Sequence, residues 1–157
     1  MKKPTLYLDT SIISAYWYDG GDIAMMARRL HTREWWDLER TYFTVWTSAF
    51  SEAELKAGTF ARQRECLKMV RRIRYLPATN LVRDLKAEIM RRKIVPANKE
   101  GDATQLAISA AHEVDYLLTW NCKHLANAQM MRKIESVCQQ QGYPMPIICT
   151  PEELMGA

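Results

Sequence analysis

Three acidic residues and one amide lie beside segments that the sequence predicts to be strand ends or helix starts. Asp9 directly follows the apolar run 6–8, and Glu54 lies just beyond a second apolar run. Asp102 opens a helical pattern, and Asn121 follows a third apolar run. Because the carboxyl ends of parallel strands meet at one edge of a sheet, all four side chains could gather there although they are far apart in the sequence.

These residue types favour a divalent metal site. Carboxylates that are brought together repel one another, so a group of Asp9, Glu54 and Asp102 is destabilised unless a cation binds. Magnesium and manganese both suit oxygen ligands, and either ion can activate water when open coordination positions remain. We therefore expect Asp9, Asp102 and Glu54 to bind Mg²⁺ or Mn²⁺.

Each of these residues also has an ordinary structural explanation. Residues 9–11 (Asp-Thr-Ser) could cap a following helix, residues 51–54 match a capping box, and residues 102–105 are a variant of one. Asn121 could cap a helix or form a turn. Caps explain why a polar residue is present, but not why three acids and one amide fall where one α/β site would gather them.

The elements that must position these residues alternate along the chain. Short apolar runs predict buried strands, namely 6–8, 42–46, 116–118, a fourth at 146–149 and a brief fifth at 75–76. Patterns with 3.6-residue spacing predict helices, namely 24–38, 62–74, one around 82–89, one around 103–110, and 129–141, which Gly142 closes. Strands that alternate with helices predict an α/β fold with a central parallel sheet of about five strands and helices on both faces.

Length and composition limit the number of domains and the class of protein. The chain has 157 residues, of which 48% are hydrophobic and 25% charged, so we expect one domain spanning residues 1–157. No apolar run approaches the roughly 20 residues that a membrane helix needs, and the run before Asp9 is short for a signal peptide. We therefore expect a cytoplasmic protein without a membrane segment. The four cysteines form no C-x-x-C pair, so neither a zinc site nor a disulfide framework is predicted.

The basic residues concentrate in the middle third of the chain, although the net charge is only +4. Four of them could hold an RNA backbone or could simply form a solvated helix face, namely Arg64, Lys68, Arg71 and Arg72. Trp120, beside Asn121, could stack on a base, or it could be a core or rim residue. The other four tryptophans (Trp17, Trp35, Trp36 and Trp46) are interpreted as core or interface residues, and His112 and His124 as structural.

Four segments in order resemble the motifs of PIN-domain nucleases. Residues 6–13 (LYLDTSII) resemble the opening strand and acidic turn, and Ser48 followed by Glu54 resembles the second motif. Residues 101–108 (GDATQLAI) resemble the third motif, and residues 114–121 (VDYLLTWN) resemble the fourth. The likeness covers nearly the whole chain and is greatest to VapC-type toxins of toxin–antitoxin pairs. The fourth motif usually ends in Asp, whereas this chain has Asn121.

The resemblance implies a PIN-like fold and a metal-dependent endoribonuclease. Asp9 and Asp102 would be the principal metal ligands, and Glu54 would bind the metal through water or orient the attacking water. Asn121 would position a water or a phosphate oxygen, while Thr10 and Ser11 would contact substrate or cap the helix. The resemblance also implies an RNA substrate, a cognate antitoxin and a homodimer, for which the apolar surroundings of Met25, Met26, Met130 and Met131 are a candidate interface.

Two other functions remain open on the sequence. In one, Asp9 is the phosphorylated nucleophile of a phosphatase, but such enzymes usually carry a second Asp where this chain has Ser11. In the other, the domain is a non-catalytic module that binds RNA or a protein partner, with Asn121 marking a decayed site. Retained RNA affinity without metal-dependent cleavage would distinguish the module from a nuclease.

Overall fold

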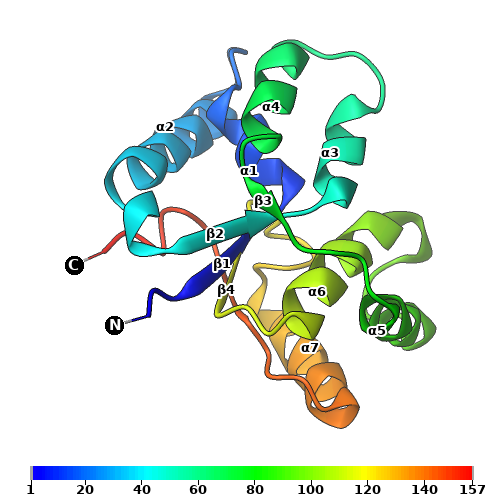
Figure 1. The fold of residues 1–157 in the computed structure, drawn as a ribbon. Coiled ribbons are helices and arrows are strands. Elements are labelled where there is room, and N and C mark those ends of the chain that lie inside the picture. Colours follow the sequence, from blue (N-terminus) through cyan, green and yellow to red (C-terminus); the bar gives the residue numbers. More distant parts are fainter. Residues whose placement is uncertain (1, 157) are drawn as a thin grey trace.

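A parallel five-stranded sheet forms the centre of the molecule in a computed structural model that describes residues 2–156 (Figure 1). Its strand order is β3-β2-β1-β4-β5, and every neighbouring pair is parallel. The strands are β1 (Thr5–Leu8), β2 (Thr44–Thr47), β3 (Arg74–Tyr75), β4 (Tyr116–Leu118) and β5 (Ile147–Cys149). The predicted fold class is confirmed.

Helices cover both faces of this sheet. The described residues form seven α-helices: α1 (Thr10–Tyr16), α2 (Ile23–Leu38), α3 (Ala49–Lys56), α4 (Gln63–Val70), α5 (Asn80–Arg91), α6 (Glu100–Ala111) and α7 (Ala128–Gln141). Two short 3-10 helices, Arg40–Tyr42 and Ala97–Lys99, complete the elements. In Figure 1, α1 to α4 lie above the sheet and α5 to α7 lie below it. No helix of residues 2–156 is long and apolar enough to cross a membrane.

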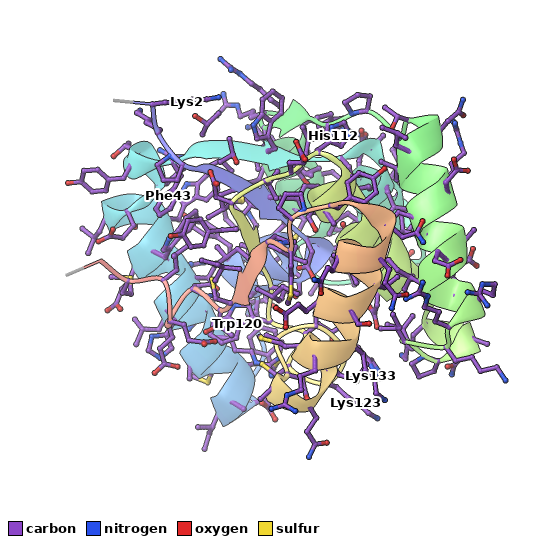
Figure 2. All side chains as sticks on the ribbon, turned by 90° about the horizontal axis from the view of Figure 1, so that it is seen from below. Lys2, Phe43, His112, Trp120, Lys123 and Lys133 are labelled. Carbon is purple, nitrogen blue, oxygen red and sulfur yellow. The ribbon has the colours of Figure 1, made fainter. Side chains whose placement is uncertain are left out.

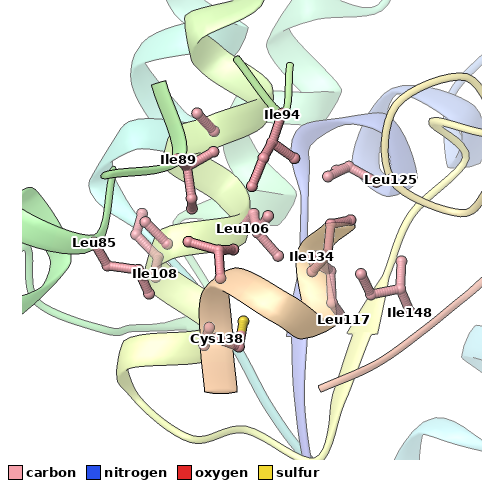
Figure 3. Packing of buried hydrophobic residues seen from close by; sticks show 14 of the residues in the cluster. Leu85, Ile89, Ile94, Leu106, Ile108, Leu117, Leu125, Ile134, Cys138 and Ile148 are labelled. Carbon is pink, nitrogen blue, oxygen red and sulfur yellow. The ribbon is translucent and has the colours of Figure 1, made fainter. Parts of the chain in front are cut away.

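Strand β1 lies at the centre of the sheet because its side chains are apolar on both faces. Leu6, Tyr7 and Leu8 are all fully buried, as expected for a strand covered on two sides. Tyr7 packs in a cluster with the buried residues of α5 to α7 and with residues of β4 and β5, part of which Figure 3 shows. Leu6 and Leu8 pack on the other side, with Trp35 of α2 and the buried residues of α1 and α4.

The strand order reverses beside β1, and this reversal shapes the edge of the sheet at which the strands end. From β1 the chain moves outward to β2 and β3, and then returns to place β4 on the other side of β1. The connections from β1 and β4 therefore leave the sheet in opposite directions and open a crevice at their carboxyl ends. Asp9 follows β1 and Thr119 follows β4 at this crevice.

Some predicted boundaries are wrong for local reasons. The helix predicted over 62–74 ends at Val70, because the chain must turn at residues 71–73 to pair Tyr75 with Thr47. The strand predicted from residue 42 begins at Thr44, where it pairs with Thr5 at the start of β1. The remaining helical patterns are confirmed, including the end of α7 at Gly142 in a left-handed conformation.

Candidate active site at the carboxyl edge of the sheet

Asp9 is held in the crevice by hydrogen bonds from two neighbouring elements. It is the N-cap of α1, where its Oδ1 accepts from the Ser11 backbone N–H at 2.9 Å and from the Ser11 hydroxyl. Its Oδ2 accepts from the hydroxyl of Thr119, which follows β4 on the other side of the crevice. The predicted cap is therefore real, but it accounts for only part of this side chain's surroundings.

Burial makes Asp9 an unusual carboxylate. The residue is only 4% exposed, and loss of water raises the pKa of its carboxyl from 3.8 to about 6. The hydrogen bonds from Ser11 and Thr119 oppose this rise, whereas the charge of Glu54 adds to it. An ionised Asp9 is therefore costly to the folded protein, and a bound cation would lower that cost.

Glu54 reaches the same edge from α3. Its Oε1 accepts from the Thr10 hydroxyl at 2.5 Å and from the Gln105 side-chain N–H at 2.9 Å. Its Oε2 lies against Gly101, where a Cβ atom would come within 3.0 Å of that oxygen. Glycine at this position lets the carboxylate lie against the first turn of α6.

Glu52 points elsewhere, although it stands only two residues before Glu54. Its carboxylate accepts from Arg71 Nε at 2.8 Å and from the Tyr75 hydroxyl at 2.9 Å. These bonds, with that from Arg71 as the larger influence, hold the pKa of Glu52 below its usual value. Of these two glutamates, Glu54 is the one that contacts Thr10, the residue next to Asp9.

Asp102 carries a carboxylate oxygen without a partner. Its Oδ2 is buried and accepts no hydrogen bond from residues 2–156. The capping explanation is wrong for this residue, because α6 already begins at Glu100 with Lys99 as its N-cap. Asp102 instead lies in the first turn, where the helix dipole favours a negative charge. A buried carboxylate oxygen normally has a partner, so this one is available to a ligand.

Asn121 is partly committed to a local turn. Its backbone N–H donates to Thr119 Oγ1 at 2.9 Å, and its side-chain oxygen accepts from the His124 backbone N–H at 3.0 Å. The prediction that it could serve as a turn residue is confirmed. Its side-chain NH₂ group is the part that remains for a contact with a water or a phosphate oxygen.

Gln105 connects the site to the core and was missed by sequence reasoning except as part of a cap. The side chain is 3% exposed, and its NH₂ group donates to Thr10, Ser51 and Glu54. Its oxygen accepts from the hydroxyl of Tyr7, which also contacts Ser48 Oγ at 2.7 Å. Burial raises the pKa of Tyr7 well above its ordinary value, so this hydroxyl stays protonated and donates. A lone amide within the apolar run of α6 was the available clue.

Ser48 is the N-cap of α3, so the capping box predicted at residues 51–54 is wrong. The Ser48 hydroxyl accepts from the Ser51 backbone N–H at 3.3 Å, so Ser48 is the N-cap and Ser51 lies inside the helix. With the helix starting at Ala49, Glu54 lies in its second turn and is not the reciprocal acid of a box. A capping box therefore does not account for the position of Glu54 at the site.

The predicted metal ligands surround the crevice without converging on one point. Asp9 and Glu54 are linked through adjacent residues, since Thr10 follows Asp9 and donates to Glu54. Within residues 2–156, no three His, Cys, Asp or Glu side chains lie close enough to form a metal-binding group. The donors nevertheless fit a hard cation, because Asp102 offers an unpartnered buried oxygen and Asp9 a desolvated carboxylate.

An open hollow of about 720 Å³ lies beside Asp9 and includes Ser11 and Asn121. Arg28 and Lys123 also line it, and neither was singled out in the sequence. Trp120 belongs to its wall but is only 7% exposed, and its indole N–H donates to Thr32 Oγ1 at 2.8 Å. The burial of this ring argues against the predicted stacking on a base.

The predicted basic residues of α4 and of the turn that follows it lie together on the surface. Gln63 and Leu67 join them in lining one hollow of about 560 Å³, whose basic members are Arg64, Lys68, Arg71 and Arg72. Arg71 differs from the others because it is paired with Glu52. The remaining three are exposed cations with no acid within ion-pair distance among residues 2–156.

Together, the fold and the site define an α/β protein whose parallel sheet carries a buried carboxylate, Asp9, at the crevice where its strand order reverses. No protein-family model, curated protein or solved structure matches the chain.

Proposed function

We propose that this protein is a metal-dependent endoribonuclease, acting as the toxin of a bacterial toxin–antitoxin pair. The observation that carries the proposal is the buried oxygen of Asp102, which has no partner among residues 2–156 and stands in the turn of α6 where Gly101 adjoins Glu54. Asp9 adds a desolvated carboxylate at the carboxyl edge of the sheet. Resemblance of four sequence segments to PIN-domain motifs supports the choice of RNA as substrate.

Asp9 and Asp102 would hold the cation, which is Mg²⁺ or Mn²⁺. The bound ion would supply positive charge that offsets the charge of the phosphodiester during hydrolysis. Both residues offer hard oxygen donors, and ionised Asp9 would gain most from the ion because its carboxylate is buried.

Glu54 would orient the attacking water. Its carboxylate is fixed by Thr10 and Gln105, so one oxygen is engaged while the other lies beside Gly101. A carboxylate that is already fixed loses less conformational freedom when it binds water in the reacting geometry.

The substrate would enter through the hollow beside Asp9. Arg28 and Lys123 would contact the phosphates, and the NH₂ group of Asn121 would donate to a phosphate oxygen. These contacts act on the backbone, so they would position the RNA without selecting its sequence.

Partner binding belongs to the same proposal. A ribonuclease toxin requires an antitoxin, and we expect the chain to pair with itself as well. On α2, three of the exposed large apolar side chains are candidates for such contacts, namely Ile23, Met26 and Leu30. Met130 and Met131 pack partly against the core beneath the sheet and are less available.

Cleavage of RNA tests the proposal. Antitoxin-free protein should cut end-labelled structured RNAs with Mg²⁺ or Mn²⁺ and leave them intact in EDTA. Asp102→Asn and Asp9→Asn should each lower the rate by at least the ten- to hundredfold that loss of a metal-supporting residue costs. Asp84→Asn, which changes an exposed acid of α5, is the matched control and should cut at the wild-type rate.

Two outcomes would count against the ribonuclease. If folded Asp9→Asn and Asp102→Asn cut as fast as wild type, the carboxylates do not perform the reaction. If wild-type protein binds RNA but cuts none in either metal, the chain is better described as a non-catalytic RNA-binding module.

A further inference from the structure

A third hollow, of about 640 Å³, lies on the side of the sheet that α1 to α4 cover. Aromatic side chains line it from the end of α1, from α2 and from the segment before β2, namely Tyr16, Trp17, Trp36 and Phe43. None of the four is fully buried, so their rings contribute to the surface of the hollow. We call this feature the aromatic–basic hollow.

Positive charge surrounds these rings. Five basic residues line the hollow, including Arg40, Lys68 and Arg72, against one acid, Glu65. Glu65 itself lies 3.6 Å from Arg62, a residue outside the hollow. Arg40, Lys68 and Arg72 form no ion pair within residues 2–156. The hollow therefore suits an anionic ligand.

The aromatic groups are arranged as a stacking surface. The guanidinium of Arg40 lies 4.4 Å from the centroid of the Trp36 ring, a distance at which the two groups attract each other. Tyr16 packs edge-on against both Trp17 and Trp36, with centroids 5.2 and 6.1 Å away, and this contact supports the ring positions. Aromatic rings and arginine planes are the groups on which unpaired RNA bases stack.

The hollow continues into the basic surface of α4. Lys68 and Arg72 line both the aromatic–basic hollow and the neighbouring hollow that contains Arg64 and Arg71. Tyr16 is the last residue of α1, and Asp9 caps the first turn of the same helix. A helix rises about 1.5 Å per residue, so Tyr16, the part of the hollow that α1 supplies, lies about 10 Å along the helix axis from Asp9.

We propose that the aromatic–basic hollow binds a nucleotide of single-stranded RNA, with its base on Trp36 and Arg40 and its phosphates on Lys68 and Arg72. A nucleotide satisfies both halves of the hollow because it carries a flat base and an anionic phosphate in one unit. The role of this RNA as substrate rests on the proposed ribonuclease function, whereas its binding does not.

Binding of a fluorescently labelled oligouridylate, followed by anisotropy in EDTA, tests the hollow without any cleavage. The double variant Lys68→Glu/Arg72→Glu should weaken binding by at least about tenfold. It should also lower the salt dependence of binding, because RNA that makes fewer phosphate contacts releases fewer counterions when it binds. The control Arg83→Glu/Lys133→Glu makes the same change in charge with exposed residues of α5 and α7. Figure 2 shows Lys133 well apart from Phe43 of the hollow. Equal weakening by the two double variants would overturn the proposal.

The base contact has its own variant. Trp36→Leu keeps an apolar side chain but removes the ring, so affinity should fall about tenfold with the salt dependence unchanged. Wild-type affinity in a Trp36→Leu protein with a wild-type circular dichroism spectrum would contradict the stacking role. Displacement of the oligouridylate by an oligoglutamate peptide of equal charge, at equal concentration, would assign the hollow to acidic proteins and overturn the proposal.

These measurements separate RNA binding in the aromatic–basic hollow from the proposed ribonuclease activity. Oligouridylate binding that depends on Lys68, Arg72 and Trp36, together with no metal-dependent cleavage, would contradict the ribonuclease and support the hollow. Metal-dependent cleavage, together with oligouridylate binding that does not depend on those three side chains, would support the ribonuclease and contradict RNA binding in the hollow.

Discussion

At the level of single residues, burial of the Asp9 carboxyl makes the stability of the protein depend on pH. Folding removes its carboxyl from water and raises its pKa from 3.8 to about 6, so the folded protein binds this proton more tightly than the unfolded chain does. The resulting stability is full below about pH 4 and is lost as the pH rises through 6. Above pH 6 the ionised group costs roughly 3 kcal/mol, at 1.36 kcal/mol for each unit of pKa.

Replacement of Asp9 should therefore stabilise the metal-free protein in a pH-dependent way. In EDTA at pH 8, Asp9→Asn should raise Tm by several degrees because an amide avoids the cost of a buried charge. Near pH 4.5 the difference should nearly vanish, since wild-type Asp9 is then protonated. Thermal unfolding followed by circular dichroism measures both values, with Asp84→Asn as the control. A variant that is no more stable than wild type at pH 8 would contradict the burial argument.

Gln105 should matter to both stability and activity. Gln105→Leu removes the shared partner of Tyr7, Ser51 and Glu54. Tyr7 and Ser51 are buried, and each buried unsatisfied group costs about 1–3 kcal/mol. We expect a loss of roughly 3 kcal/mol in the free energy of unfolding, together with about a tenfold lower kcat and little change in KM. Urea unfolding and RNA-cleavage kinetics measure these quantities.

Ser109→Ala provides the control for Gln105→Leu. Ser109 is a buried residue of the same helix, and its hydroxyl donates only to the Leu106 carbonyl. It should cost stability without lowering kcat. If Gln105→Leu lowers stability but leaves kcat unchanged, Gln105 supports the core and does not position Glu54.

Part of this site could be predicted from the residue types at strand ends, whereas the rest depends on contacts that only the folded chain forms. Asp9 could be placed because it follows an apolar run, and Glu54 because it follows Ser48 at a spacing typical of a known motif. Gln105 could not be placed, because its partners come from β1, α1 and α3, which only the folded chain brings together. The unpartnered state of Asp102 likewise depends on packing that the sequence does not display.

At the level of elements, the first turn of α6 is shaped to accept Glu54. Gly101 lies inside this helix, where alanine would ordinarily be more stable by about 1 kcal/mol. A Cβ there would come within 3.0 Å of the Glu54 carboxylate and 3.5 Å of the Phe50 ring. Gly101 therefore makes this helix less stable than alanine would, but leaves space for the Glu54 carboxylate.

Gly101→Ala should separate stability from activity. The flexible end of Glu54 can move by a few tenths of an ångström, so the free energy of unfolding should stay within about 1 kcal/mol of wild type or rise. Displacement of Glu54 should lower the cleavage rate about tenfold. Gly21→Ala, where a Cβ meets no atom within 4 Å, should leave the rate unchanged. A Gly101→Ala protein with wild-type activity would show that the position of Glu54 is not critical.

Helical spacing predicted the long elements well and the short ones poorly. Helices α2, α5 and α7 have apolar stripes long enough to be recognised, and the structure contains them close to the predicted bounds. The helix predicted over 62–74 was too long because Ile73 continues the apolar spacing after the chain has left the helix. Ile73 packs against the same core as α4, so its apolar character is explained without helical structure.

At the level of the whole molecule, the sheet brings distant residues to one edge. Asp9 and Thr119 stand 110 positions apart in the chain, yet they share a hydrogen bond because β1 pairs with β4. The parallel sheet could be predicted from alternating strands and helices, which require crossover connections. The order of its strands could not, because pairing partners of short apolar runs are chosen by packing of the complete chain.

The charge of the molecule is also organised at this scale. The net charge of +4 is modest, but Arg40, Lys68 and Arg72 meet on the side of the sheet covered by α1 to α4. The carboxylates instead occupy the crevice at the end of the sheet. Separation of the two regions would let one RNA strand be held by cations while its backbone reaches the acids.

Manganese binding tests the proposed metal site without requiring a substrate, because electron paramagnetic resonance counts free Mn²⁺. Wild-type protein at pH 7.5 should bind at least one ion, with an affinity that falls as the pH drops through 6 and Asp9 becomes protonated. Asp102→Asn should weaken binding by at least about tenfold, and Asp84→Asn should leave it unchanged. Wild-type protein that binds no ion, or an Asp102→Asn protein that binds as tightly as wild type, would contradict the metal site and the function built on it.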